Sequence, residues 1–397
     1  MAPLSAGPTD EQVPYPSAVD GGTDHARVAI DDAGNAVVAY SFGDAIVANY
    51  RPAGGSVGAP TTLSSAGTFA DLALSGGRAM LVYREADQAL WRVSSPAGAW
   101  QSPVQLGPTK STLPPRFAVG AGGVLACWEL RSDTTSDAYF SYAATATGTF
   151  STAVALGLPS GIVPQYNGTA LLYDPHAVWL SDDTGLIVWG GAYDTTSQRF
   201  SSEWSGGTLS PAIVAKGIGF GATAQLVAGP GEAGLFGDQS AIEVTNYQPD
   251  SGWTPGKGVV SQGIKSDFVY LSAAEYAVGY NDVAGYFDLA IIQGGMMTDL
   301  VRVSEKAAEA AFVATPGDGS ALILWSTLRN DPSGTQYLDA FYARYEHGVI
   351  SELKQLEGKQ PRQVPLAAAV NAAGRGALVW TDGADAIADL HLSLVDE

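Results

Sequence analysis

The sequence predicts an all-β chain folded as one closed β-propeller of eight four-stranded blades, with seven blades as the alternative count. Two short strand patterns each recur eight times along the chain, and they are offset from one another at the two ends. The composition agrees, because 46% hydrophobic residues, 15% charged residues and 48 glycines are typical of a turn-rich β protein. A repeat architecture also explains how 397 residues can form a single domain, 1–397.

The first pattern is an apolar strand that ends in an aromatic residue. It recurs at intervals of 43 to 61 residues, a spacing typical of propeller blades. We expect these aromatic side chains to pack between neighbouring blades. They are Tyr40, Tyr83, Trp128, Trp189, Phe236, Tyr280, Trp325 and Trp380.

The second pattern is a short strand, often Pro-x-x-Leu or Pro-x-x-Val. Its eight copies are residues 16–19, 60–63, 103–106, 153–156, 211–214, 257–260, 300–303 and 353–356. The first copy precedes every aromatic strand, whereas Trp380 is followed by only one more strand, 387–395. We therefore predict that the N-terminal strand completes the C-terminal blade, which hides strand edges that would otherwise be bare.

These patterns divide the chain into blades. The boundaries are 25–65, 67–108, 113–157, 170–215, 220–262, 265–304, 309–357, and 363–397 together with 11–20. In the first blade we expect strands 25–30, 36–40, 45–50 and 59–64, with a glycine turn at 31–34. No helix is predicted, and the Ala/Glu-rich segment 305–311 is expected to be a loop or a single turn. The longest loops are 157–175 and 326–337.

Several segments resemble known propellers. The repeat Asp-x-x-Gly-Asn-Ala-Val-x-x-Tyr/Trp, complete at residues 31–40, resembles the blades of bacterial repeat propellers. Residues 83–92, followed by Trp100 and the strand 103–106, are similar to a blade of propeller lectins, which implies the propeller fold and suggests sugar binding. Residues 181–185 with Trp189 resemble the Asp-box of sialidase-type propellers, but the tryptophan falls one residue late. The turn also joins the first two strands of its blade, so we interpret it as structural.

Charge and composition exclude several classes of protein. A net charge of −20 with scattered basic residues would repel nucleic acid. No apolar run is long enough to span a membrane. The single cysteine, Cys127, lies in an apolar strand and is predicted to be a core residue. No signal-peptide pattern begins the chain. We expect a mature extracellular or periplasmic protein, with a cytoplasmic location as the alternative.

Candidate functional residues gather on the face that carries the loops from second to third strands and the connections between blades. His25 and His176 are predicted at equivalent places, the start of an innermost strand, each closely preceded by an aspartate. With Tyr173 they are candidate catalytic residues, because an imidazole oriented by a carboxylate can act as a general base. A histidine that only satisfies a turn is the alternative. Candidate ligand-binding residues on the same face are Arg84, Glu85, Arg116, Glu129, Arg131, Tyr193, Asp282 and Arg329.

No motif assigns a cofactor. The chain has no nucleophile elbow, no dinucleotide-binding motif and no P-loop. His347 and His391 are predicted on or after third strands, away from the axis, so the four histidines cannot converge and no metal ligand is assigned. Loosely held Ca²⁺ among the aspartates stays open, although no EF-hand spacing supports it.

Three functions remain. The preferred one is recognition of carbohydrate, or another small extracellular ligand, at one site on the loop-lined face. The second is an enzyme acting on an anionic polysaccharide, either a lyase in which arginine neutralises a uronate, or a glycoside hydrolase using Glu85 and Glu129. The third is a protein–protein scaffold with the apolar loops 217–220 and 294–297.

Overall fold

The computed structural model describes residues 9–14, 25–96, 98–111, 113–132, 135–162, 171–193, 196–215, 224–238, 242–254, 257–260, 265–358, 362–383 and 389–395. These residues form strands, turns and loops and contain no helix. The segment 305–311 is only partly the predicted loop, because its second half belongs to the strand β28 (Ala308–Ala314). Pairing with a neighbouring strand overrides the weak helical preference of the Ala/Glu sequence.

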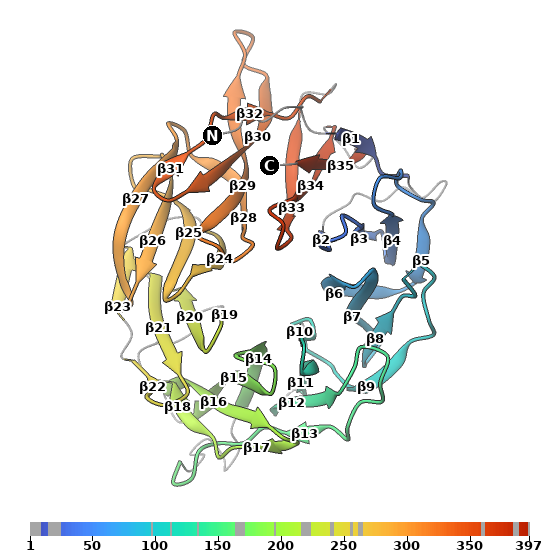
Figure 1. The fold of residues 1–397 in the computed structure, drawn as a ribbon, viewed down its shortest axis with the longest axis vertical. Helices are drawn as coiled ribbons and strands as arrows, with labels where there is room; N and C mark the ends of the chain where they lie inside the picture. Colours follow the sequence, from blue (N-terminus) through green and yellow to red (C-terminus); the bar gives the residue numbers. More distant parts are fainter. Residues whose placement is uncertain are drawn as a thin grey trace.

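Antiparallel meanders are arranged as a ring, so the prediction of an all-β propeller is confirmed (Figure 1). We call each meander a blade and name it after its innermost strand. The β2 blade contains β2 (Ala26–Ile30), β3 (Ala36–Phe42), β4 (Ala45–Arg51) and β5 (Thr61–Ser64). The β6 blade contains β6 (Gly67–Ser75), β7 (Arg78–Glu85), β8 (Gln88–Val93) and β9 (Val104–Pro108).

The next two blades share one nine-stranded sheet. The β10 blade contains β10 (Arg116–Gly120), β11 (Gly123–Arg131), β12 (Ser136–Ala143) and β13 (Val154–Ala155). The β14 blade contains β14 (Leu171–Trp179), β15 (Thr184–Tyr193), β16 (Thr196–Ser205), β17 (Thr208–Leu209) and β18 (Ile213–Ala215). A single parallel pair, Ser136 with Leu171, joins the two meanders. The described residues therefore form seven hydrogen-bonded sheets.

The remaining blades complete the ring. The β19 blade contains β19 (Gln225–Gly229), β20 (Glu232–Asp238), β21 (Ile242–Gln248), β22 (Gly252–Trp253) and β23 (Lys257–Val260). The β24 blade contains β24 (Lys265–Ser272), β25 (Glu275–Asn281), β26 (Phe287–Gln293) and β27 (Met296–Ser304). The β28 blade contains β28, β29 (Ser320–Asn330), β30 (Gln336–Glu346), β31 (Val349–Ile350) and β32 (Lys354–Gln355). The β33 blade contains β33 (Gln363–Val370), β34 (Gly376–Asp382) and β35 (Asp389–Val395).

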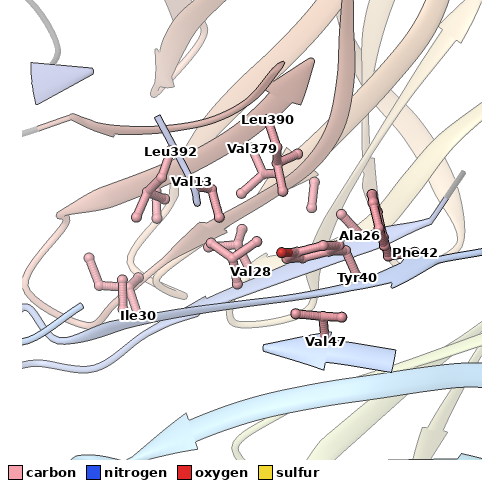
Figure 2. Packing of buried hydrophobic residues seen from close by; sticks show 14 residues of the cluster. Val13, Ala26, Val28, Ile30, Tyr40, Phe42, Val47, Val379, Leu390 and Leu392 are labelled. Atoms are coloured by element: carbon pink, nitrogen blue, oxygen red, sulfur yellow. The ribbon is translucent and has the colours of Figure 1, made fainter. Parts of the chain in front are cut away.

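The N-terminal strand closes the ring. Strand β1 (Thr9–Gln12) pairs antiparallel with β35 and becomes the outermost strand of the β33 blade, which confirms the predicted closure. The closing strand is therefore 9–12, whereas the copy proposed for this role, residues 16–19, lies outside the described residues. Val13, directly after β1, is fully buried next to Leu392 and Val28 of the two adjoining blades (Figure 2).

The aromatic residues that end the second strands form the cores between blades, as predicted. All eight are buried, with exposed fractions of 5% or less. Tyr40, for example, packs with residues of the β33 blade, and Trp325 packs with Phe287 of the β24 blade. Cys127 is also fully buried, which confirms it as a core residue.

The blade topology defines two faces of the ring. Because successive strands are antiparallel, the loops from second to third strands lie on the same face as the connections between blades. We call this the loop face. The turns from first to second strands lie on the other face, where Asp31 accepts a hydrogen bond from the Gly77 amide at 2.8 Å and Asn371 donates one to the Asp31 carbonyl at 2.7 Å. The turns that begin at Asp31 and Asn371 therefore join neighbouring blades.

Candidate functional site

Four consecutive innermost strands carry an ionisable residue at one register position. In each case the residue pairs with the one that directly precedes the aromatic residue of the second strand. We call these four residues the inner row: Arg27, Asp71, Arg116 and His176. In the β19, β28 and β33 blades the same position holds apolar Leu226, Phe312 and Ala367. Four consecutive blades therefore carry ionisable residues at a level where these three blades are apolar.

Asp71 lies between two arginines of neighbouring blades. Burial raises the pKa of the Asp71 carboxyl, and this effect outweighs the positive charges of Arg27 and Arg116, which lower it. The carboxylate also accepts a hydrogen bond from the Leu72 amide at 2.9 Å. A partly buried carboxyl with a raised pKa, flanked by cations, is a typical feature of a functional site.

Asp174 is the centre of a buried ionic cluster. One carboxylate oxygen lies 3.0 Å from His176 Nε2, and the other accepts a hydrogen bond from Arg199 Nη2 at 3.0 Å. Arg116 Nη2 approaches the first oxygen at 3.8 Å. Burial alone would raise the pKa of Asp174, but the hydrogen bond from His176 and the two arginines outweigh it and hold the pKa well below its usual range. Asp174 is therefore ionised at neutral pH.

His176 is held inside this cluster. Its exposed fraction is 5%, and burial lowers the pKa of the imidazole, so the ring is neutral at pH 7. The neutral ring donates Nε2–H to Asp174, because an ionised carboxylate can only accept. The imidazole thus holds the Asp174 carboxylate in place by a hydrogen bond. The catalytic role of His176 stays a prediction.

The predicted equivalence of His25 and His176 is wrong. The His25 carbonyl accepts a hydrogen bond from the amide of Ser41, which directly follows the aromatic Tyr40. In the β14 blade the residue that directly follows the aromatic Trp189 is Gly190, and it pairs with Tyr173. Tyr173 is therefore the residue equivalent to His25. The register shifts between Tyr173 and His176, and Asp174 adopts a positive φ of 48° there. This bulge moves His176 inward, whereas His25 is exposed beside the start of β2.

Glu129 joins two blades. Its exposed fraction is 2%; Oε1 accepts a hydrogen bond from Ser136 at 2.8 Å, and Oε2 accepts one from the Asp174 amide at 3.3 Å. The Ser136 hydroxyl also lies 2.7 Å from the Leu172 carbonyl. These contacts lie where the β10 and β14 blades share one sheet, so Glu129 connects blades and is covered from solvent.

Tyr173, Arg116 and Arg84 face solvent in part. The Tyr173 ring lies against Gly190, where an added Cβ would be 2.4 Å from the ring, and the Arg199 guanidinium lies 5.4 Å from the ring centre. The Arg116 side chain is 39% exposed. Arg84 donates hydrogen bonds to the Ser111 carbonyl and, at 3.2 Å, to the Thr68 hydroxyl. The structure thus brings the predicted residues Arg116, Glu129, Tyr173 and His176 into one cluster, with Arg84 in the adjacent β6 blade.

The other predicted binding residues lie apart from this cluster. Glu85 and Arg131 end second strands of the β6 and β10 blades on the loop face, and Tyr193 ends β15. Asp282 lies 3.6 Å from Arg302 in the β24 blade. Arg329 in the β28 blade donates a hydrogen bond to Asp339 at 2.6 Å and stacks on Tyr337. Asp282 and Arg329 therefore belong to separate ion pairs.

Sequence reasoning missed Arg27, Asp71 and Arg199. The sequence carried part of the signal: Asp71 and Arg116 each lie 12 residues before the aromatic residue of their blade, whereas Arg27 lies 13 residues before Tyr40 and is aligned with them only by strand pairing. Within the described residues, no group of three or more His, Cys, Asp or Glu is arranged to hold a metal ion. No helix in the described part of the chain is long and apolar enough to cross a membrane.

Comparison with known proteins shows a fold and no family. No protein-family model matches the sequence, and no curated protein matches it. The propeller domain of the trilobed protease from Pyrococcus furiosus superposes with a TM-score of 0.51 and 10% identity, covering 85% of this chain and 98% of that one. A prolyl endopeptidase superposes with a TM-score of 0.51 and 13% identity over 93% of this chain, which spans 54% of that enzyme's length.

A fucose-specific lectin from Aleuria aurantia is also similar, with a TM-score of 0.38 and 12% identity, covering 86% of this chain and 96% of the lectin. The likeness to the propeller domain of the trilobed protease agrees with the β-propeller fold of this chain. At these identities the likeness concerns the fold alone, and function has to be argued from the site.

Asp71→Asn is expected to stabilise the folded protein at pH 7. Because burial raises the pKa of Asp71 above its unfolded value, the group favours folding at low pH, and this contribution is lost as pH rises through the folded pKa. The amide can still accept the Leu72 hydrogen bond without carrying a charge. Denaturant unfolding at pH 7 and pH 4 should give a gain that shrinks at the lower pH. The exposed Asp44→Asn is the control, and a loss of stability at pH 7 would contradict the prediction.

Proposed function

We propose that this protein is an eight-bladed, ligand-binding β-propeller that recognises carbohydrate on its loop face. The count of eight takes the two meanders of the nine-stranded sheet as separate blades. The proposed site lies over the β6, β10 and β14 blades and includes Arg84, Arg116 and Tyr173. Sugar hydroxyls both donate and accept hydrogen bonds, so they are complementary to such a mixture of guanidinium and phenol groups.

One observation carries the proposal. Arg116 keeps 39% of its side chain exposed on an innermost strand, yet its guanidinium lies 3.8 Å from Asp174, which Arg199 fixes from behind at 3.0 Å. A half-exposed donor positioned by a buried, ionised carboxylate is preorganised for a ligand, and preorganisation reduces the entropy lost on binding.

The same geometry supports binding more than catalysis. A general base has to come within hydrogen-bond reach of the proton it removes. His176 is buried, neutral and hydrogen-bonded to Asp174. Of the two predicted catalytic histidines, only His25 is exposed, and it lies in the β2 blade, outside this cluster.

The test is a glycan array with neutral and uronic-acid oligosaccharides, followed by calorimetric titration of the best ligand. We expect saturable binding that weakens at least ~10-fold in Arg116→Ala, since one lost charged hydrogen bond is worth about 1.5–3 kcal/mol. Arg329→Ala, which removes a 47% exposed arginine from the same face, is the matched control and should bind normally.

Two results would overturn the proposal. One is the absence of binding to every glycan, and the other is unchanged affinity in Arg116→Ala. Ultraviolet absorbance and new reducing ends should be followed in the same mixtures. Turnover that is lost in His25→Ala or His176→Ala would replace recognition by the lyase or hydrolase alternative.

A further inference from the structure

We propose that the carbohydrate carries an anionic group, a carboxylate or a sulfate, that binds between Arg27 and Arg116, and that Asp71 takes up one proton from solvent when it binds. This inference rests on the proposed function, because it names the chemical class of the carbohydrate and the part of the site that selects it.

Arg27 and Arg116 are the two cations of the inner row, and both are available to a ligand. Arg27 is exposed and donates a hydrogen bond to the Ala26 carbonyl at 3.1 Å. Arg116 contacts its carboxylate partner at 3.8 Å, a longer ion pair than those of Arg51 at 2.7 Å and Arg199 at 3.0 Å.

Both arginines act on the same carboxyl group from opposite sides. Arg27 lies on β2, Asp71 on β6 and Arg116 on β10, the innermost strands of three consecutive blades (Figure 1). Arg27 and Arg116 are each close enough to Asp71 to lower its pKa. An anion bound between the two guanidinium groups would therefore lie beside the Asp71 carboxyl group.

Two negative charges at this place would repel one another. A like charge in contact favours the protonated form of a carboxyl group, and burial already raises the pKa of Asp71. The described groups that act on the Asp71 carboxyl group are Arg27 from β2, Arg116 from β10 and the backbone amides of Leu72 and Phe117, and the Cys127 thiol of β11 also lies near it. Burial raises the pKa of that thiol, which keeps it protonated. Proton uptake by Asp71 thus removes the charge that competes with the ligand.

The experiment is calorimetric titration with three saccharide probes of equal length: an oligogalacturonate, its carboxyl-reduced neutral form, and an oligosaccharide that carries sulfate groups and no carboxylates. We expect the two anionic probes to bind at least ~10-fold more tightly than the neutral one, the scale of one charged hydrogen bond. The two anionic arms separate carboxylate from sulfate as the preferred group. Arg27→Gln and Arg116→Gln should lose this discrimination, while Arg329→Gln keeps it.

Proton uptake is measured on the unmodified protein, in buffers of different ionisation enthalpy between pH 5 and 8. We expect up to one proton per bound ligand and an affinity that rises as pH falls, by as much as ~10-fold per pH unit where uptake is complete. Asp71→Asn should bind without proton uptake and with a flat pH profile.

The outcomes separate the two proposals. Equal affinity for charged and neutral probes, with no proton uptake, would overturn this inference and leave carbohydrate recognition in place. Tight anion binding with proton uptake that persists in Asp71→Asn would also overturn it, because another group would then titrate. Failure of all three probes to bind the unmodified protein, after failure of the glycan array, would overturn both.

Discussion

Asp174→Ala is expected to lower the free energy of unfolding by about 3–5 kcal/mol at pH 7, as when one partner of a buried ion pair is removed. The Arg199 side chain is only 4% exposed, and it would lose the carboxylate that it contacts at 3.0 Å. His176 would lose its 3.0 Å contact, and the strained backbone at φ 48° would lose the interactions that hold it. Denaturant unfolding followed by tryptophan fluorescence measures the loss.

The pH dependence of this loss has a defined sign. Since the pKa of Asp174 is lowered on folding, its contribution to stability is fully present above the unfolded pKa of about 3.9 and is lost as pH falls through the folded pKa. The difference between wild type and variant should therefore be constant from pH 7 to pH 5 and shrink in more acidic solution.

Two controls make this result specific. Asp87→Ala removes an exposed carboxylate 3.8 Å from Lys110, and it should cost less than ~1 kcal/mol, as exposed ion pairs do. Replacing both Asp174 and Arg199 with apolar residues should recover part of the loss, because no charge is then left buried and unpaired. A loss below 1 kcal/mol in Asp174→Ala would show that the cluster is open to water.

Deletion of residues 1–13 is the second large perturbation, with an expected loss of at least ~3 kcal/mol. It removes Glu11, which pairs with Arg51 at 2.7 Å where the arginine is only 9% exposed. It also removes Val13, a fully buried residue of the core between the β2 and β33 blades (Figure 2). The deletion also removes Asp10, which lies 3.0 Å from His391 Nδ1 and accepts a hydrogen bond from Ser393.

The deletion should also change the association state. Without β1, the strand β35 would present an unpaired edge, and such edges promote intermolecular pairing. Sedimentation velocity at increasing concentrations should detect oligomers that the full chain does not form. Gln12→Ala alters an exposed side chain of the same strand and should stay within ~0.5 kcal/mol of wild type. A monomeric deletion variant of unchanged stability would show that the ring does not depend on this strand.

The local features of the fold were predictable because each blade repeats its own pattern. The eight aromatic residues could be assigned to the cores between blades, since an apolar second strand ending in a large ring has to be covered on both faces. The closure by an N-terminal strand followed from the offset of the two strand patterns. The residues that provide it did not follow, because the strand pattern pointed to 16–19, whereas the strand that pairs with β35 is 9–12, which does not match that pattern.

The candidate site was predictable only in part. Arg116, Glu129, Tyr173 and His176 were identified as polar residues near the loop face, and they do lie together. The roles of Glu129 and His176 depend on a bulge at Asp174 that local sequence does not signal, and the bulge buries the histidine instead of exposing it. Arg329 and Asp282 looked equivalent to Arg116 in the sequence, but each has a partner of its own in another blade.

The sequence by itself determined the class of fold, the repeating unit, the core residues and the way the ring closes, because all of these follow from short-range periodicity and from burial. Only the tertiary structure decided the inner row. Arg27, Asp71 and Arg116 are separated by about one blade each along the chain, and they become neighbours because consecutive innermost strands lie side by side in one register. The raised pKa of Asp71 has the same origin, since burial and the charges of adjacent blades come from that packing.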